Sequence, residues 1–191
     1  MARQHGLKTL RILRRLGEIM ITKALRLLVL FAAVGWPLVD AAPADAEDED
    51  AATMAAALKD AKLTLQDGLK AGEREGQPIS AQFEIDDGKL RLSVYTTKGD
   101  DFTEVVADPK TGAVVKAEKI TDADELNDAA DQKAAMAKAK VSLSAAVDAA
   151  VKENAGALPV AIFPDLRDGH PIAEITLLQG TTPKTVTEKL D

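Results

Sequence analysis

Few side chains in this sequence could act as a nucleophile, a general base or a metal ligand. The chain has no cysteine and two histidines, and only His170 lies beyond the basic N-terminal stretch. A Ser-His-Asp relay would have to bring His170 to a serine, and the chain contains four: Ser80, Ser93, Ser142 and Ser144. No serine has the flanking glycines of a nucleophile elbow, and no glycine-rich phosphate loop is present. The sequence therefore predicts no catalytic residues and no cofactor, and we expect His170 to be an exposed turn residue.

Carboxylates are abundant and could hold a divalent cation. They are adjacent in Glu47–Asp50, Asp86–Asp87 and Asp100–Asp101. None of these runs has the Asp-x-Asp-x-Asp-Gly spacing of a calcium loop, and zinc sites of the usual kinds need more His or Cys ligands. The two aspartate pairs fall in expected turns, where aspartate stabilises the backbone. We predict no metal site at these residues, while calcium binding by an acidic surface stays open as an alternative.

The first 46 residues have the order of a secretory signal peptide. Seven Lys or Arg lie between Arg3 and Arg26, and the uncharged run 27–39 and a series of small residues follow. The apolar run has 13 residues, whereas a membrane-spanning helix needs ~20, so we expect cleavage after Ala46, or alternatively Ala41, and no stable span afterwards. Translation starts at Met1 or at Met20, which heads a more typical signal.

The chain that remains after cleavage is acidic. Removal of residues 1–46 takes away seven basic and three acidic residues, which leaves 17 Lys plus Arg against 28 Asp plus Glu, a net charge of about −11. Nucleic acids and anionic membranes need clustered basic residues, and none occur. The sequence predicts a periplasmic or secreted protein without a nucleic-acid partner, and it assigns no oligomeric state.

The strongest local signal is the turn at residues 108–112. Asp108, Pro109, Thr111 and Gly112 separate two hydrophobic strands at 102–107 and 113–117, because proline presets φ and glycine accepts positive φ. Upstream, Thr64 is expected to cap a helix that ends at Gly72, and an Asp-Gly turn at residue 87 joins two alternating strands. Residues 62–120 are therefore predicted to form one helix-plus-meander module. Gly68 within this helix indicates close packing on a strand or a kink.

The same pattern returns about 78 residues later. Ala61–Leu65 is matched by Ala139–Leu143, in which Ser142 is expected to be a helix N-cap, and a helix, an apolar strand and an Asp-Gly reversal follow. We predict an acidic leader and alanine-rich helix at 47–61, a linker helix capped by Thr121 at 121–139, and a second, truncated module at 140–191 that lacks the terminal turn. The fold class is α+β, with the two modules sharing a sheet or lying separately on the linker.

Together, the Lys-Leu-Thr-Leu and Lys-Val-Ser-Leu helix starts, the meander and the Val-Val-Ala-Asp-Pro-Lys-Thr-Gly-Ala-Val-Val ending resemble the PepSY domain family. The resemblance implies a small extracytoplasmic α+β module without enzymatic activity, found in peptidase propeptides and in secreted or membrane proteins, and proposed to inhibit peptidases.

These observations favour a non-enzymatic periplasmic PepSY-domain protein that binds a peptide or a protease in the cell envelope and regulates it. The alternative from another class is an acidic envelope structural or divalent-cation-binding protein, and an enzyme is the least favoured hypothesis.

Overall fold

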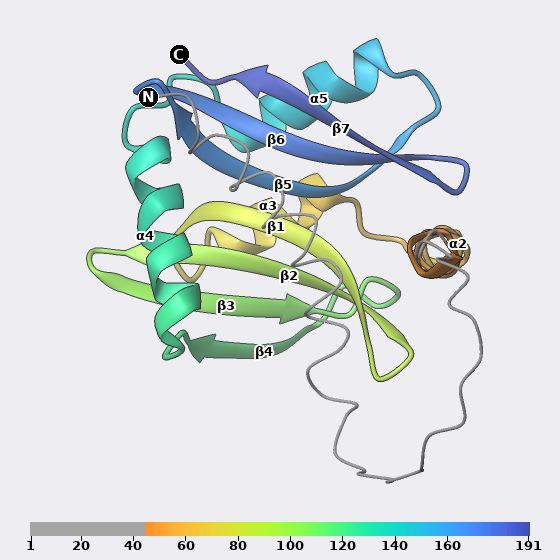
Figure 1. The fold of residues 1–191 in the computed structure, drawn as a ribbon. Coiled ribbons are helices and arrows are strands. Elements are labelled where there is room, and N and C mark those ends of the chain that lie inside the picture. Colours follow the sequence, from red (N-terminus) through yellow and green to blue (C-terminus); the bar gives the residue numbers. More distant parts are fainter. Residues whose placement is uncertain (1–44) are drawn as a thin grey trace, which may run out of the picture. The chain divides into compact units, whose positions relative to one another are not determined.

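The structure, a computed structural model, describes residues 45–191, with side chains described from Asp50 onward. Four helices and seven strands make up this part of the chain (Figure 1). In chain order they are α2 (Asp45–Leu58), α3 (Leu65–Gly72), β1 (Gln77–Asp86), β2 (Lys89–Lys98), β3 (Asp101–Ala107), β4 (Val114–Lys119), α4 (Ala123–Met136), α5 (Leu143–Glu153), β5 (Leu158–Arg167), β6 (His170–Gln179) and β7 (Thr182–Lys189). The predicted start codons and Ala41 lie outside the described residues. Ala46 lies in α2, and cleavage after it stays a prediction.

The helices α3 and α5 begin at the residues that the sequence predicts as caps. The hydroxyl of Thr64 accepts the backbone N–H of Asp67 at 3.1 Å, and the Asp67 carboxylate accepts the backbone N–H of Thr64 at 2.9 Å. This capping box satisfies two otherwise unpaired backbone donors, and the Thr64 N–H lowers the pKa of Asp67 below its ordinary value. At the corresponding place, Ser142 accepts the N–H of Ala145 at 3.2 Å.

The predicted cap of α4 is wrong by one residue. Asp122, not Thr121, holds the N-cap position, and its carboxylate accepts the N–H groups of Asp124 at 2.9 Å and Glu125 at 3.0 Å. A carboxylate is the better cap here because it also interacts favourably with the positive end of the helix dipole.

All seven strands form one antiparallel sheet in the order β4-β3-β2-β1-β5-β6-β7. The α+β class is therefore confirmed, and the strands of the two halves share a sheet rather than lying apart on the helix between them. The meander β1 to β4 occupies one half of this sheet and the meander β5 to β7 the other, and β1 and β5 meet in the middle.

The two meanders repeat one another at a spacing of 81 residues. Asp87 and Asp168, which begin the tight turns, have φ of 50° and 54°, as type I′ hairpins require. A β-bulge follows Pro78 in β1 and Pro159 in β5, again 81 residues apart. Where β1 pairs with β5, Ala81 faces Ile162, which is the same spacing, so an approximate two-fold axis passes through this pair, normal to the sheet.

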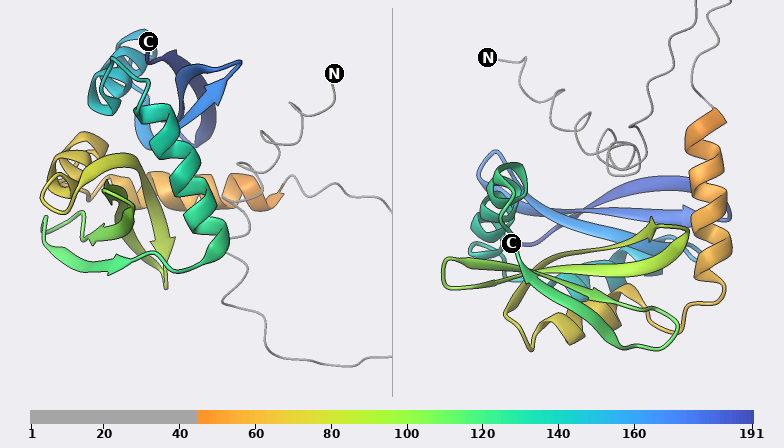
Figure 2. Two further views of the ribbon diagram at one scale, coloured as in Figure 1. Left: turned by 90° about the vertical axis from the view of Figure 1, so that its left-hand side faces the viewer. Right: turned by 90° about the horizontal axis from the view of Figure 1, so that it is seen from below.

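One face of the sheet is covered by α3 and α5, which lie side by side (Figure 2). Their buried residues Leu69 and Val147 join sheet residues such as Val94 and Ile175 in one core. Each of these four side chains is almost wholly removed from water, which supplies about 1.5–3 kcal/mol per aliphatic side chain.

The opposite face is covered at one end by α4, which does more than link the halves. Ala129 of α4 is buried against Ile79 and Ile120, and Phe102 and Met136 pack around them. At the other end, Ala51 and Ala55 of α2 pack on Val160 and Leu178. Helix α4 runs across the near face of the sheet in Figure 1, and α2 is seen there along its axis.

The helix-start segments are tied to the sheet in the same way in both halves. The carbonyl of buried Pro109 accepts the N–H groups of Lys62 at 2.8 Å and Leu63 at 3.1 Å. Leu190 lies 81 residues after Pro109 and is also buried. Its carbonyl accepts the N–H groups of Lys140 at 2.6 Å and Val141 at 3.0 Å. Leu190 therefore supplies the bond that the turn proline supplies in the first half, although the turn motif itself is absent there.

Within residues 45–191, no helix combines the length and the apolar character that crossing a bilayer requires.

We predict that Gly68→Ala destabilises the protein by about 1–2 kcal/mol. A β-carbon on Gly68 would lie 2.8 Å from Cγ of Leu92, which is fully buried in β2. Overpacking of a tight core costs ~1–3 kcal/mol and outweighs the gain of ~1 kcal/mol in helix propensity. Urea unfolding measures the change, with exposed Lys70→Ala in the same helix as the control. The double variant Gly68→Ala/Leu92→Ala should lose less stability than the sum of the single changes, and strict additivity would contradict the contact.

Candidate functional site

The turn at residues 108–112 is held by its own backbone. The N–H of Gly112, whose φ is 77°, donates to the carbonyl of Asp108 at 2.8 Å. The Asp108 carboxylate accepts the N–H groups of Lys110 at 2.8 Å and Thr111 at 3.3 Å, and the Lys110 bond in particular holds the pKa of Asp108 below its usual range. The Thr111 hydroxyl accepts the N–H of Ala113 at 3.3 Å. These contacts shape the loop, so the most recognisable sequence motif positions backbone rather than a reactive group.

His170 lies at the exposed start of β6, with 73% of its side chain accessible. Its Nδ1 is 2.8 Å from Oδ2 of Asp191, and this hydrogen bond lowers the pKa of Asp191. Two members of a catalytic relay are thus adjacent, but among the described residues no hydrogen bond joins a serine to His170.

The four serines have structural partners or positions of their own. Ser80 and Ser93 are fully buried, and their hydroxyls donate to Oε1 of Gln132 at 2.7 Å and Oε1 of Glu84 at 2.9 Å. The other two lie at the start of α5: Ser142 as its N-cap and Ser144 in its first turn. Within residues 50–191, the geometry brings no serine together with His170.

The paired aspartates are matched by nearby cations. The ion pairs are Asp86–Arg91 at 3.1 Å, Asp100–Lys133 at 3.0 Å and Asp101–Lys119 at 2.9 Å. Asp87 takes the positive-φ position of its turn. In the part of the chain that the structure describes, no three His, Cys, Asp or Glu side chains converge as metal ligands would.

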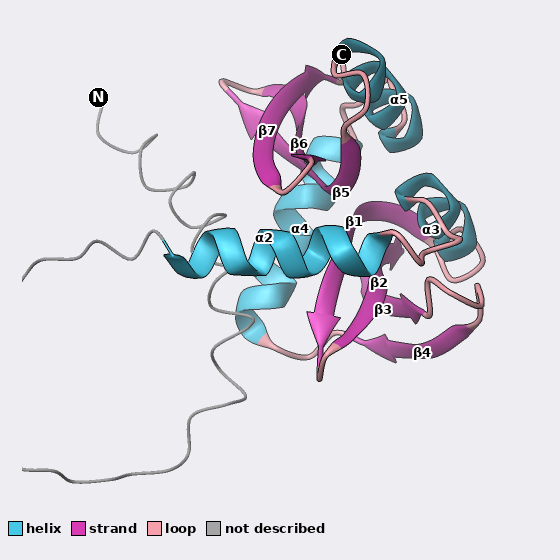
Figure 3. Cartoon of the chain, turned by 90° about the vertical axis from the view of Figure 1, so that its right-hand side faces the viewer, coloured by secondary structure: helices cyan, strands magenta, loops and turns pink. Residues whose placement is uncertain are grey.

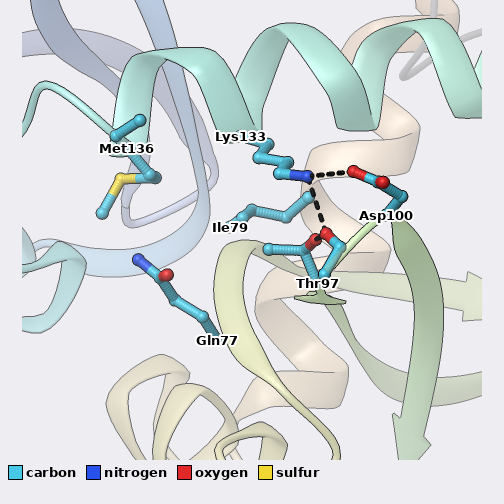
Figure 4. Close-up of a pocket in the computed structure, with 8 residues that line it drawn as sticks. Gln77, Ile79, Thr97, Asp100, Lys133 and Met136 are labelled. Atoms are coloured by element: carbon cyan, nitrogen blue, oxygen red, sulfur yellow. Dashed lines mark hydrogen bonds and ion pairs between the residues drawn. The ribbon is translucent and has the colours of Figure 1, made fainter.

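A small pocket of about 280 Å³ opens between α4 and the strands β1 and β2 (Figure 4). Lys133 reaches across it and donates to the carbonyl of Gly99 at 2.6 Å and to Asp100 at 3.0 Å, while its ammonium lies 5.7 Å from the ring centre of Phe102. Thr97 donates to the same Gly99 carbonyl at 3.1 Å. Lys133 is the only cationic residue among those that line this pocket, and its bonds hold the β2–β3 turn against α4. Its charge is therefore already paired and is not free to bind a ligand.

Glu84 is a half-buried carboxylate that sequence reasoning missed. It lies on the central strand β1, and burial, followed by its neighbours Glu104 and Asp86, raises its pKa above the usual value despite the hydrogen bond from Ser93. The signal was available in principle, because the Phe-Glu-Ile alternation places Glu84 on the sheet face opposite Phe83. That β1 lies in the middle of the sheet, with a strand on each side, follows only from the β1–β5 pairing.

The two edges of the sheet are the main unpaired surfaces of the described residues (Figure 3). All six residues of β4 are exposed. Val114 and Val115 are 47% and 56% accessible, and the one other large hydrophobic side chain exposed to this degree in the described part is Leu158. Edge strands with exposed apolar side chains commonly take up another chain.

A scan against family models matches residues 49–118 to PepSY, described as "Peptidase propeptide and YPEB domain". The matched region runs from α2 through β4. This part of the chain is therefore similar to the PepSY family, the family that its sequence resembles.

No curated protein matches the chain. Among solved structures, it is similar to a "putative lipoprotein" from Clostridium difficile 630, with 18% sequence identity over 64% of this chain and 80% of that one. The TM-score is 0.36, and at that value the likeness supports no statement about this chain.

We predict that Glu84→Gln stabilises the protein at pH 7 and that the gain disappears in acid. Because the folded state raises the pKa of Glu84, the charged carboxylate costs stability above the pKa of the unfolded chain, ~4.3, and costs nothing well below it. The glutamine oxygen can still accept the Ser93 hydroxyl. Melting temperatures at pH 7 and below pH 4 test this, with exposed Glu75→Gln as the control. A difference that is equal at both pH values would refute the assignment.

Proposed function

We propose that this chain is an exported, non-enzymatic PepSY protein that binds an extended segment of another cell-envelope protein, with peptidases as the partner class. The family match supports a regulatory role of the propeptide type. The absence of a converged nucleophile, base or metal set among the described residues leaves recognition as the activity that the geometry favours.

The proposal includes the architecture of the exported chain. Residues 1–46 are the signal peptide, 47–61 an acidic leader and helix, 62–120 the first PepSY-like module, 121–139 the joining helix and 140–191 a second PepSY-like module. The 81-residue repeat of strands, bulges and turns supports two related modules. The signal-like order of residues 1–46 supports a periplasmic or secreted location.

The observation that carries the proposed activity is the exposed edge strand β4 with its two accessible valines. The bond from the N–H of Ile120 to the carbonyl of Phe102, at 3.0 Å, fixes which residues of β4 face β3. Together with the β3–β4 register, this bond means that the backbone N–H and C=O groups of Ala117 and Lys119 point away from the sheet. A peptide strand would bond to these groups and place apolar side chains beside Val114 and Val115.

We predict that Val114→Lys/Val115→Lys weakens peptide binding at least tenfold and leaves the fold intact, because both side chains are on the surface. Binding is measured with extended peptides selected from a displayed library and, in parallel, as inhibition of peptidases in an envelope fraction. Leu158→Lys, which changes an equally exposed apolar residue on β5, is the matched control.

Two results would count against the proposed function. One is a wild-type chain that selects no peptide and inhibits no envelope peptidase at micromolar concentration. The other is a double-lysine variant that binds as well as the wild type.

A further inference from the structure

The second edge strand, β7, directs the backbone of alternate residues away from the sheet. The N–H of Leu190 donates to the carbonyl of Pro171 at 2.9 Å, and the β6–β7 register continues from there without a shift. Since hydrogen-bonded pairs recur at every second residue of an antiparallel ladder, Thr185 and Thr187 point their N–H and C=O groups outward. Among the described residues, no strand pairs with this side of β7.

The sequence of this strand is complementary to itself. Residues 184–188 read Lys-Thr-Val-Thr-Glu. If a second copy of β7 lies antiparallel and is centred on Val186, valine faces valine, each Thr185 faces Thr187, and each Lys184 faces Glu188. Opposite-charge and β-branched cross-strand pairs each contribute ~0.2–1 kcal/mol.

We propose that β7 pairs with β7 of a second copy of this chain about a two-fold axis through Val186, which gives a homodimer with one continuous sheet. This interface uses the edge opposite to β4, so it is independent of the peptide site proposed above. A closed two-fold contact also uses up the edge, whereas other strand additions leave an edge open to further growth.

Lys184 and Glu188 of β7 have no ion-pair partner in the part of the chain that the structure describes. Lys184 donates to the amide oxygen of Asn154 at 2.6 Å, which is a neutral partner. Glu188 lies near the like charge of Glu153, and no cation of the described residues lies within ion-pair distance of it. Lys184 and Glu188 are four positions apart on a strand, or ~13 Å at 3.3 Å per residue, so they cannot pair with each other. In the dimer, Lys184 and Glu188 each meet an opposite charge.

The other edge strand, β4, does not carry unpaired opposite charges of this kind. In β4, Lys116 and Glu118 lie two positions apart and already form an ion pair at 3.0 Å. The pairing of β1 with β5 provides a precedent for the proposed contact. Equivalent strands there meet antiparallel about an approximate two-fold axis, and their helices lie on the same face, where Gln66 donates to Asp148 at 2.9 Å.

Pro183 is compatible with the proposed register. It stands at an outward position, where it has no N–H to donate. In the dimer it faces Lys189 of the second copy, whose N–H can donate to the Pro183 carbonyl. The proline therefore lies at the end of the paired segment and removes a single bond.

Sedimentation equilibrium of the purified protein over a concentration series at low salt tests the dimer. We expect the mass to approach twice that of one chain, and Lys184→Glu or Glu188→Lys alone to raise the dissociation constant roughly tenfold or more, since each reversal creates two like-charge pairs. An equimolar mixture of the two variants restores opposite charges across the strands and should associate again. Lys189→Glu makes the same change in charge opposite a proline and should behave as the wild type.

Disulfide trapping provides a second test that does not depend on the charge variants. The chain has no cysteine, and Val186→Cys places two thiols at a non-hydrogen-bonded pair, where Cα atoms are ~4.5 Å apart and a disulfide can form. Thr187→Cys faces Thr185 instead and should not cross-link. The proposal is overturned if the wild type keeps the mass of one chain throughout the series. It is also overturned if the mixture of reversals fails to associate, or if Thr187→Cys cross-links as readily as Val186→Cys.

Discussion

The fold depends on the short ladder between β1 and β5, in which Ala81 faces Ile162 and Gln82 faces Ala161. So few paired residues provide little backbone bonding, and the two halves must be held mainly by side chains. The largest core cluster meets this need because it takes residues from both halves and buries Ile162 completely. Since the halves share one core, we expect them to unfold together rather than one by one.

The same architecture determines where the protein has backbone groups free to pair with another chain. Helices α3 and α5 cover one face of the sheet, and α4 and α2 cover the two ends of the other. The pocket beside α4 is spanned by Lys133, whose charge is already matched by Asp100. Unpaired backbone therefore remains at the sheet edges. Recognition through a strand edge needs no converged reactive side chains, which agrees with the scattered positions of His170 and the serines.

The sequence predicted what local physics determines. The caps at Thr64 and Ser142 depend on residues within one turn, and the Asp-Gly turns need only the positive φ that those residues tolerate. The pairing of β1 with β5 and the covering role of α4 depend on contacts between distant segments, which periodicity does not specify. The burial of Glu84 was missed for this reason. The self-complementary charges of β7 become meaningful only when the strand is known to lie at an edge of the sheet.

The 81-residue repeat and the approximate two-fold axis through the β1–β5 pair have a consequence for assembly. Two free copies of one module, meeting through equivalent strands, would separate on dilution. Connecting them in a single polypeptide through α4 makes the encounter intramolecular, with an effective concentration in the millimolar range for a short linker. The β1–β5 contact can therefore be short and still persist at any protein concentration.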